Sequence, residues 1–233
     1  LEPGGYGGGP MWRIYQYTLC PFSRKVRLAL AEKGVSFELV EEFPWQGRDA
    51  FLEMNPAGQT PVAVWKDNEC VLCDSTAIIE YFEETVRENP LLGSGPLERA
   101  EVRRVVAWFD QTFFAEVGVI LLQERMYNRL VTRQPPNTHL LRQAHQAIET
   151  HLDYIEYLLD HRRWLGGATF SLADMTAAAH LSVVDYLGGI DWKTHDQAKQ
   201  WYSAIKSRPC FRPFLGERMT GLVPPSYYEK LDF

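Results

Sequence analysis

The stretch WRIYQYTLCPFS, residues 12 to 23, decides the fold of the first part of this chain. Trp12 to Tyr17 alternates in the manner of a half-buried strand. Cys20 and Pro21 then form a turn, after which apolar residues recur at helical spacing up to Gly34, which is placed to end the helix. The stretch therefore predicts a strand, a cysteine-bearing turn and a helix.

The segments that follow complete a small mixed sheet. Apolar alternation indicates further strands, and a short turn between two of them indicates a hairpin. In chain order we expect a strand at Val35 to Val40, a helix at Gln46 to Met54, a hairpin of Thr60 to Trp65 with Val71 to Leu72 about a turn at 66 to 69, and a helix from Ser75 to about Glu84. The resulting order, βαβαββα, predicts a sheet with helices packed on its faces.

An all-α domain is predicted after a linker. Amphipathic helical patterns run at Leu97 to Arg133, Asn137 to Arg162, Leu172 to Leu187 and Asp196 to Ser207. Ser171 and Asp174 have the spacing of a capping box at the start of the third pattern. We therefore divide the chain into an α/β domain at 11 to 86, a linker rich in Gly and Pro at 87 to 96, an all-helical domain at 97 to 220 and a C-terminal tail at 221 to 233.

Composition limits the partners and the compartment. The formal net charge is -6 at pH 7, which argues against a nucleic-acid partner because such binding needs clustered Lys and Arg. The sequence has no apolar run long enough to span a bilayer and no signal peptide, so we expect a cytoplasmic protein. Residues 1 to 10, mostly Gly and Pro, are interpreted as a cloning remnant.

The cysteines and histidines do not predict a metal site. Four cysteines are too few for a disulfide scaffold and indicate a reducing compartment. Cys70 and Cys73 have the spacing of a zinc-ligand pair, but no second pair accompanies them, so both are interpreted as strand residues. The histidines lack ligand spacing and are interpreted as surface or helix residues.

Three segments together suggest a site for a tripeptide thiol. Cys20 lies at a predicted helix start, where the helix dipole and free backbone N–H groups stabilise a thiolate. A cis bond between Thr60 and Pro61 would leave the backbone of Thr60 free to pair with an extended peptide. Asp74 and Ser75 open the next helix, whose first amides can hold a carboxylate.

The motifs in these segments resemble those of glutathione transferases, especially the cysteine-bearing, omega-like branch. The resemblance rests on Cys-Pro-Phe-Ser at 20 to 23, Asn-Pro-x-Gly-x-x-Pro-Val at 55 to 62, Asp-Ser-x-Ala-Ile-x-x-Tyr at 74 to 81 and Phe-Ser-Leu-Ala-Asp at 170 to 174. It implies the glutathione-transferase fold, in which a thioredoxin-like α/β domain precedes an all-α domain, and it implies a homodimer.

The same resemblance implies a glutathione site. The residues it assigns are Cys20, or alternatively Ser23, facing the thiol; Thr60 and Pro61 at the cysteinyl backbone; and Asp74 with Ser75 at the γ-glutamyl end. Because no second cysteine follows three residues after the first, mixed-disulfide chemistry is expected rather than an internal dithiol switch. No cofactor or metal is expected, and glutathione is left open as a ligand or cosubstrate.

The tail points away from catalysis. Residues 221 to 233, GLVPPSYYEKLDF, contain two prolines that preclude a helix and end on apolar, acidic and aromatic side chains. The ending Pro-Pro-x-x-Tyr-x-x-Leu-Asp-Phe resembles that of the glutathione-transferase-like division proteins of alphaproteobacteria. That resemblance implies a scaffold at the division site that binds filaments of the tubulin homologue FtsZ and affects filament shape and wall synthesis.

Two functions from different classes therefore stand, an FtsZ-binding division factor and a glutathione-dependent transferase or thiol reductase that uses Cys20. For the first, the residues expected to contact FtsZ or a wall-synthesis partner are Tyr227, Tyr228, Leu231, Asp232 and Phe233. We expect their removal to change thermal stability little, the alternative being a tail that packs on its own domain.

Overall fold

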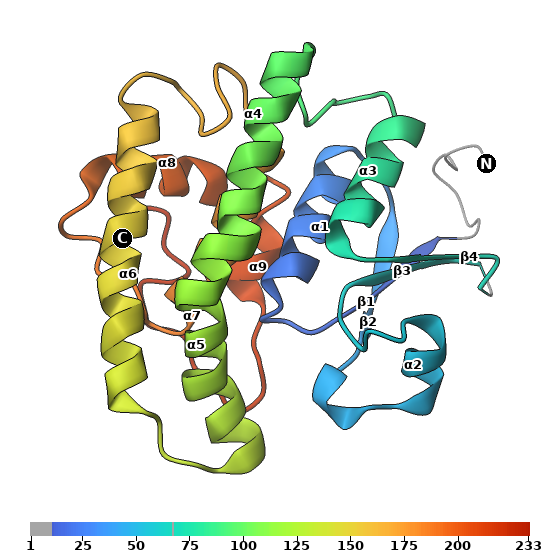
Figure 1. Ribbon diagram of the computed structural model, residues 1–233, viewed down its shortest axis with the longest axis horizontal. Coiled ribbons are helices and arrows are strands. Elements are labelled where there is room, and N and C mark those ends of the chain that lie inside the picture. Colours follow the sequence, from blue (N-terminus) through green and yellow to red (C-terminus); the bar gives the residue numbers. More distant parts are fainter. Residues whose placement is uncertain (1–10, 67) are drawn as a thin grey trace. The chain divides into compact units, whose positions relative to one another are not determined.

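A computed structural model gives the structure of residues 11–66 and 68–233 (Figure 1). The chain divides into two compact units, and the division falls between Leu91 and Leu92. Residues 1–10, interpreted above as a cloning remnant, and Asp67 of the predicted hairpin turn lie outside the described residues.

The first unit has the predicted βαβαββα order. Its elements are β1 (Trp12–Gln16), α1 (Pro21–Glu32), β2 (Phe37–Glu41), the 3-10 helix η1 (Pro44–Gln46), α2 (Asp49–Met54), β3 (Val62–Trp65), β4 (Cys70–Cys73) and α3 (Ser75–Thr85). Within the described residues, the strands form a mixed four-stranded sheet of order β2-β1-β3-β4, with β1 parallel to β2 and antiparallel to β3. The predicted α/β domain is confirmed, and Cys70 and Cys73 lie in a strand as interpreted.

Helices cover both faces of this sheet because side chains alternate along each strand. On one face, Phe51 of α2 packs against Val62 and Val64 of β3. On the other face, the ring of Trp12 lies edge-on to Phe82 of α3, with 5.1 Å between centroids, and α3 packs against α1. The helix α1 ends before Gly34, whose φ of +71° is a conformation that glycine adopts without a Cβ clash.

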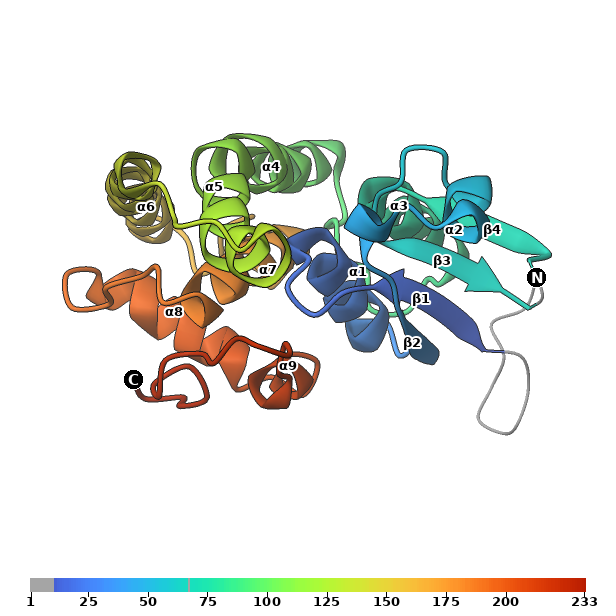
Figure 2. The same ribbon diagram turned by 90° about the horizontal axis from the view of Figure 1, so that it is seen from below.

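The second unit is all helical, as predicted. A continuous helix consists of α4 (Pro96–Ala107), the π-helical η2 (Trp108–Gly118), α5 (Val119–Leu121) and the π-helical η3 (Leu122–Thr132), and it is followed by α6 (Thr138–Leu159), α7 (Leu172–Tyr186), α8 (Asp196–Lys206) and α9 (Arg212–Gly216). Figure 2 views α6 nearly end-on, beside α8. The short α9 was not predicted, because Pro209 and Pro213 interrupt the helical pattern there.

The helix from Pro96 to Thr132 is long and apolar enough to cross a bilayer by length and composition, with a mean hydropathy of 1.6 over 18 residues. This is weak evidence for a membrane span, because a buried core helix passes the same test. The side chains of Phe109, Phe113 and Val117 are 0% exposed, and η2 packs against α6 and α7. We therefore interpret it as a core helix of the second unit.

The helix α7 forms the centre of the second unit. Every one of its residues is buried, and it packs against α4, η2 and α8. Its start is held by the predicted capping box, in which Ser171 Oγ accepts from the Ala173 N–H at 3.3 Å and Asp174 Oδ2 accepts from the Ser171 N–H at 3.1 Å. The sequence prediction of a helix start here is confirmed.

The carboxylate of Asp174 also joins α7 to distant segments. Its Oδ1 accepts hydrogen bonds from the backbone N–H of Leu165 at 2.8 Å and from Trp201 Nε1 of α8 at 2.9 Å. Burial raises the pKa of Asp174 to about 6, although these hydrogen bonds and those from Ser171 oppose the rise. One buried side chain therefore ties together the start of α7, the preceding loop and α8.

One histidine corrects the expectation that the histidines lie on the surface or in helices. His195 precedes α8 and is 5% exposed. Its Nε2 lies 3.0 Å from Oδ1 of Asp153 on α6. The expectation failed because His195 is paired with a residue 42 positions away in the chain. The spacing of histidines in the sequence does not reveal such a contact.

Replacing Asp174 with Asn should lower the free energy of unfolding by about 2 to 4 kcal/mol at pH 7. The substitution puts an N–H₂ group in place of a carboxylate oxygen, so a buried N–H group that donates to Asp174 in the wild type loses its acceptor. Because burial raises the pKa of Asp174, the wild type loses stability as pH rises from about 4 to about 6. Asn does not titrate, so the difference should be larger at pH 4 than at pH 7. Denaturant titrations measure both.

The matched control is Asp160→Asn, since Asp160 is exposed at the end of α6. It should change stability by less than about 0.5 kcal/mol. Equal effects of the two substitutions would contradict the anchoring role of Asp174.

Candidate functional site

The thiol of Cys20 lies at the first turn of α1. Cys20 is the N-cap residue, and Pro21 follows it in the first turn. Its Sγ accepts a hydrogen bond from the backbone N–H of Ser23 at 3.4 Å, and the residue is 3% exposed. The sulfur occupies the place where an oxygen of Ser or Asp usually caps a helix. The predicted position at a helix start is confirmed.

Thr60 meets this sulfur from the segment that enters β3. Thr60 Oγ1 lies 3.4 Å from Cys20 Sγ, and the Thr60 carbonyl oxygen lies 3.6 Å from it. The bond from Thr60 to Pro61 is cis, as predicted. A protonated thiol can donate to the carbonyl oxygen, whereas a thiolate can accept from the Thr60 hydroxyl and the Ser23 N–H. Both protonation states of the sulfur have partners.

The sheet register brings the predicted site segments to one end of the sheet. Tyr15 of β1 lies opposite Val62 of β3, and Val62 lies opposite Cys73 of β4. Because both pairings are antiparallel, the chain leaves β1 and β4 at the end where it enters β3. Cys20, Thr60 and Asp74 all lie in the segments at this end.

Asp74 caps α3 with its own side chain. Its Oδ1 accepts from the backbone N–H groups of Thr76 at 2.8 Å and Ala77 at 3.0 Å. These are two of the amides expected to hold a ligand carboxylate, and here Asp74 itself accepts from them. Ser75 is 5% exposed. A contribution of Asp74 and Ser75 to a γ-glutamyl site stays a prediction.

Ser23 approaches Cys20 through its backbone rather than its hydroxyl. Its N–H points to the sulfur. Its Oγ is buried and has no hydrogen-bond partner among the described residues. Ser23 as an alternative catalytic residue stays a prediction.

Tyr17 is a neighbour of the thiol that sequence reasoning missed. Burial raises the pKa of its hydroxyl well above the usual value, and the charge of the Cys20 thiolate raises it further. Its ring packs edge-on against Trp45 with 5.2 Å between centroids, and Trp45 stacks on Phe43 at 5.0 Å. Tyr17 is therefore a neutral phenol next to the thiol. The sequence signal that could have identified Tyr17 as a neighbour of the thiol is its position three residues before Cys20.

The C-terminal tail packs against helices of the second unit, to which it belongs. Tyr228 is 0% exposed, its hydroxyl donates to the Phe214 carbonyl at 3.3 Å and its ring lies 5.2 Å from that of Tyr186. The terminal residue Phe233 lies 5.3 Å from Trp192 between ring centroids. The expectation that the tail contributes little to stability is therefore corrected, because its aromatic residues complete part of the core.

A buried lysine holds the end of the tail. Lys206 Nζ lies 4.0 Å from the ring centroid of Phe233 and has no hydrogen-bond partner among residues 11–66 and 68–233. Burial lowers the pKa of Lys206 to about 8, while the charge of Asp185 opposes that shift. A cation–π contact takes the place of a hydrogen bond for this ammonium group.

The predicted partner-binding residues differ in accessibility. Leu231 is 39% exposed, and Asp232 is also exposed. Tyr227 and Phe233 are half-buried, and the Tyr227 hydroxyl donates to the Ile190 carbonyl at 3.3 Å. Tyr228 presents no surface to a partner in this conformation. The exposed candidates for a tail contact are therefore Leu231 and Asp232.

Comparisons with known proteins agree with this architecture. The family models "Glutathione S-transferase, N-terminal domain" and "Glutathione S-transferase, C-terminal domain" match residues 19–85 and 128–204. FtsZ-localized protein A of Caulobacter vibrioides is 47% identical over 222 residues, which are 94% of this chain and 97% of that protein. The uncharacterized GST-like protein YibF of Escherichia coli is 32% identical over 174 residues, 74% of this chain and 81% of that protein.

Solved structures show the same fold. A glutathione S-transferase from Rhodospirillum rubrum F11 matches with a TM-score of 0.93 and 46% identity, covering 96% of this chain and 100% of that one. FzlA from C. crescentus matches with a TM-score of 0.93 and 47% identity over the same shares. The glutathione-transferase fold expected from the motifs is thus confirmed.

Replacing Cys20 with Ala should abolish mixed-disulfide formation with glutathione disulfide near neutral pH, because two donors converge on this sulfur. Burial raises the pKa of Cys73, helped by the charge of Asp74, so Cys73→Ala is the matched control and should leave the reaction intact. Intact-protein mass spectrometry should find one glutathionyl group on the wild type and on the control. Attachment at another cysteine would contradict the assignment.

Deleting residues 227 to 233 should lower the free energy of unfolding by about 3 to 5 kcal/mol, because a buried aromatic side chain and the partner of Lys206 are lost. Leu231→Ala tests an exposed tail position and should cost less than about 1 kcal/mol. Thermal melts compare both variants with the wild type. An unchanged melting temperature for the deletion would show that the packing of Tyr228 contributes nothing to stability.

Proposed function

Because the chain belongs to the glutathione S-transferase family, we propose that it uses this fold as a division protein that binds FtsZ filaments and regulates their shape and constriction. The observation that supports the proposal is the similarity to FtsZ-localized protein A, which is 47% identical over 94% of this chain. The relative's name supports association with FtsZ. Filament shaping and constriction are the finer part of the proposal.

The extent of this similarity favours a role beyond the shared fold. A match to 94% of the chain includes at least part of the sequence after residue 204, where the C-terminal family model ends. That region contains α9 and the tail, with the exposed side chains of Leu231 and Asp232. We place a contact to a division or wall-synthesis partner there.

The remaining parts of the proposal concern location and assembly. We propose that the protein acts in the cytoplasm at the division site, since that is where FtsZ filaments lie. We also propose a homodimer, which the family resemblance implies. Size-exclusion chromatography with light scattering tests the second point directly.

A glutathione-dependent transferase or thiol reductase is the alternative, and two observations favour it. Cys20, Ser23 and Thr60 form a complete hydrogen-bonded thiol site. The similar solved structure from Rhodospirillum rubrum is also described as a glutathione S-transferase. In this alternative, Cys20 faces the thiol of glutathione, Thr60 and Pro61 bind its cysteinyl backbone, and Asp74 with Ser75 bind its γ-glutamyl end.

In the reductase form of this alternative, the Cys20 thiolate attacks the glutathionyl sulfur of a mixed disulfide. The substrate leaves as a thiolate and takes a proton, and Cys20 becomes joined to glutathione. A second glutathione thiolate then attacks that glutathionyl sulfur, which releases glutathione disulfide and restores Cys20. Because Ser23 stands where a second cysteine would form an internal disulfide, the cycle needs one free glutathione in addition to the glutathionyl group that the substrate carries.

Co-sedimentation with GTP-assembled FtsZ filaments tests the division proposal. The wild type should pellet with filaments, and Cys20→Ala should pellet equally, because a scaffold does not need the nucleophile. Samples without GTP are the control for trapping. A wild type that stays in the supernatant would contradict FtsZ binding.

A parallel assay of glutathione-dependent disulfide reduction separates the two functions. Loss of pelleting in a Cys20→Ala variant that melts normally would tie the thiol to the interaction. Reductase turnover by the wild type without FtsZ binding would instead establish the enzymatic alternative.

A further inference from the structure

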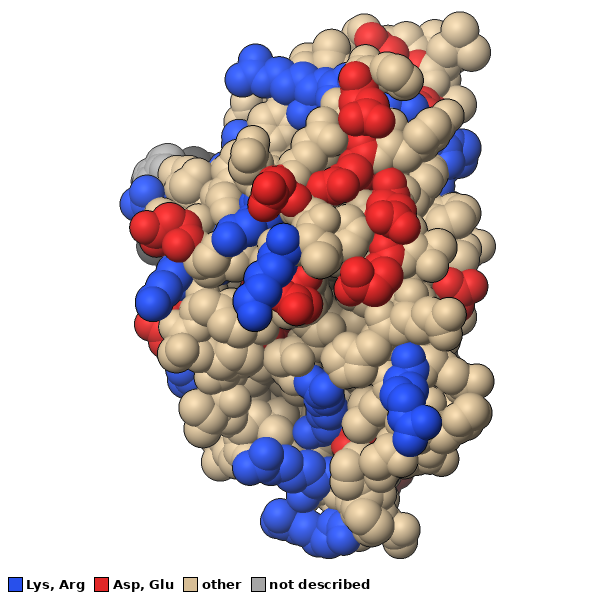
Figure 3. Space-filling model, turned by 90° about the vertical axis from the view of Figure 1, so that its left-hand side faces the viewer, with Lys and Arg blue, Asp and Glu red and all other residues tan. Residues whose placement is uncertain are grey.

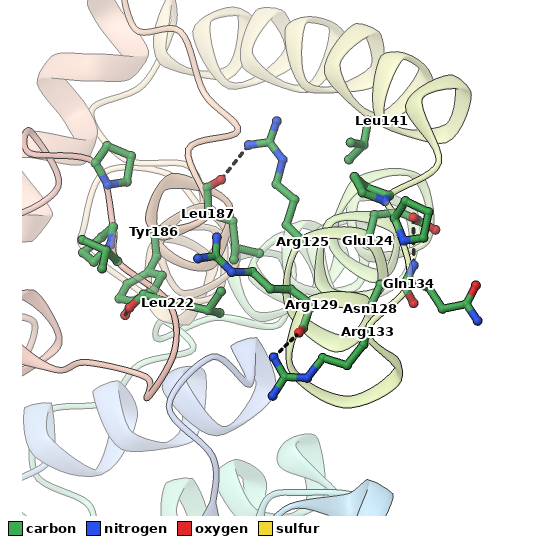
Figure 4. Close-up of a pocket in the computed structure, with 15 residues that line it drawn as sticks. Glu124, Arg125, Asn128, Arg129, Arg133, Gln134, Leu141, Tyr186, Leu187 and Leu222 are labelled. Carbon is green, nitrogen blue, oxygen red and sulfur yellow. Dashed lines mark hydrogen bonds between the residues drawn. The ribbon is translucent and has the colours of Figure 1, made fainter.

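A pocket of about 870 Å³ lies within the second unit, apart from the thiol site. It is bounded by η3, the loop before α6, the end of α7 and the beginning of the tail (Figure 4). Arginines of η3 and its C-cap line one side. The other walls include Tyr186, Leu222 and two proline pairs, at 135 to 136 and at 224 to 225.

The arginines follow one another at four-residue intervals along one helix edge. Arg125 is fixed, because its Nη1 donates to the carbonyl oxygens of Leu187 at 2.6 Å and Gly188 at 2.9 Å. Its Nη2 lies 2.9 Å from Nε2 of His145. Burial and the charge of Arg125 lower the pKa of His145, so the neutral ring can accept this hydrogen bond. Arg125 therefore adds a fixed positive charge to the pocket.

Arg129 and Arg133 are available to a ligand. Arg129 is exposed, and its guanidinium has no hydrogen-bond partner within the described parts of the chain. Arg133 is the C-cap residue of η3, and its Nη1 donates to the Arg129 carbonyl at 3.1 Å. Figure 4 shows Arg129 extending towards the side of the pocket where Tyr186 and Leu222 lie. Most N–H groups of these two side chains are unused.

The negative charge in the pocket wall already has hydrogen-bond donors from this chain. Of the lining side chains that the structure describes, Glu124 is the one carboxylate. It is 7% exposed and accepts hydrogen bonds from Asn128 Nδ2 at 3.0 Å and from the Asn137 N–H at 2.7 Å. Glu124 therefore fixes the loop before α6 and leaves the outer arginines without an acidic partner.

The apolar walls are held rigidly. The hydroxyl of Tyr186 donates to the Leu222 carbonyl at 3.2 Å and accepts from the Met219 N–H at 3.0 Å, which fixes the first part of the tail. The prolines restrict the backbone further, and Val223 is 89% exposed. A rigid wall costs little conformational entropy when a ligand binds.

We propose that this pocket docks an extended acidic segment of a partner protein, with two carboxylates on Arg129 and Arg133 and an apolar side chain against the exposed lining residues Val223, Pro135 and Pro136. Guanidinium groups pair with carboxylates through two parallel hydrogen bonds. The cluster is local, since the chain as a whole carries a net charge of -6. On the face drawn in Figure 3, acidic and basic side chains are mixed in the middle and upper part, whereas the charged side chains of the lower part are mainly basic.

An extended peptide matches the pocket better than a nucleic acid. Alternate residues of an extended chain point to the same side about 7 Å apart, so the pattern acidic-apolar-acidic directs both carboxylates to the arginines and the apolar side chain elsewhere. Tyr186 is buried, 1% exposed, and offers no stacking platform for a base. This inference goes beyond the proposed function, because it holds whether or not FtsZ supplies the segment.

Fluorescence anisotropy with the full chain tests the proposal. The probe is a fluorescein-labelled peptide in which Asp and Leu alternate between Gly-Ser flanks, and the control peptide has Asn in place of Asp. The wild type should bind the first peptide and not the second. Arg129→Glu should weaken binding about tenfold or more. Arg129→Lys keeps the charge but loses the two parallel N–H donors of the guanidinium, so it should weaken binding by a smaller factor.

The matched control is Arg163→Glu, an equal charge reversal at an exposed residue outside the pocket lining. It should change the dissociation constant by less than about twofold. All variants should keep the wild-type melting temperature, since Arg129 makes no side-chain hydrogen bond in the described structure.

Several results would overturn the proposal. These are no binding of the Asp-Leu peptide to the wild type, equal binding of the Asn peptide, or equal losses for Arg129→Glu and Arg163→Glu. Binding of single-stranded RNA or of phosphatidylglycerol vesicles that depends on Arg129, with no peptide binding, would assign the arginines to another polyanion.

Discussion

The buried carboxylate of Asp174 is the interaction on which the second unit depends. It receives hydrogen bonds from the loop before α7, from Ser171 and from Trp201 of α8, and so fixes the start of a helix that is buried along its whole length. The other end of α7 carries Tyr186, whose hydroxyl holds the first part of the tail. The tail and the arginine-lined pocket therefore take their positions from a helix that Asp174 anchors.

The thiol site of the first unit depends on a different constraint. Two antiparallel strand pairings bring the segments carrying Cys20, Thr60 and Asp74 to one end of the sheet. No residue of this group lines the arginine pocket. The thiol site therefore lies in one unit, and the tail and the arginine-lined pocket lie in the other. Fold alone does not decide which of them carries the function.

Local patterns in the sequence predicted much of the fold. Strand alternation, the Cys20 turn, the Ser171 and Asp174 capping box and the cis bond at Pro61 depend on neighbouring residues and were all predicted correctly. The burial of Tyr228 was not, because it depends on Phe214 and Tyr186, which are 14 and 42 residues away. The four-residue spacing of Arg125, Arg129 and Arg133 was visible, but only the fold brings two distant proline pairs to the same pocket. The capping of α3 by Asp74 was also missed, because it uses amides that the sequence assigned to a ligand.

The central claim is that partner recognition belongs to the second unit and is separate from the thiol site. Hydrogen–deuterium exchange of the full chain, with and without assembled FtsZ filaments, tests it most directly. The account predicts slower exchange on binding within residues 92 to 233, with no change in residues 18 to 26 and 58 to 62. Protection confined to the segments around Cys20 and Thr60 would contradict it.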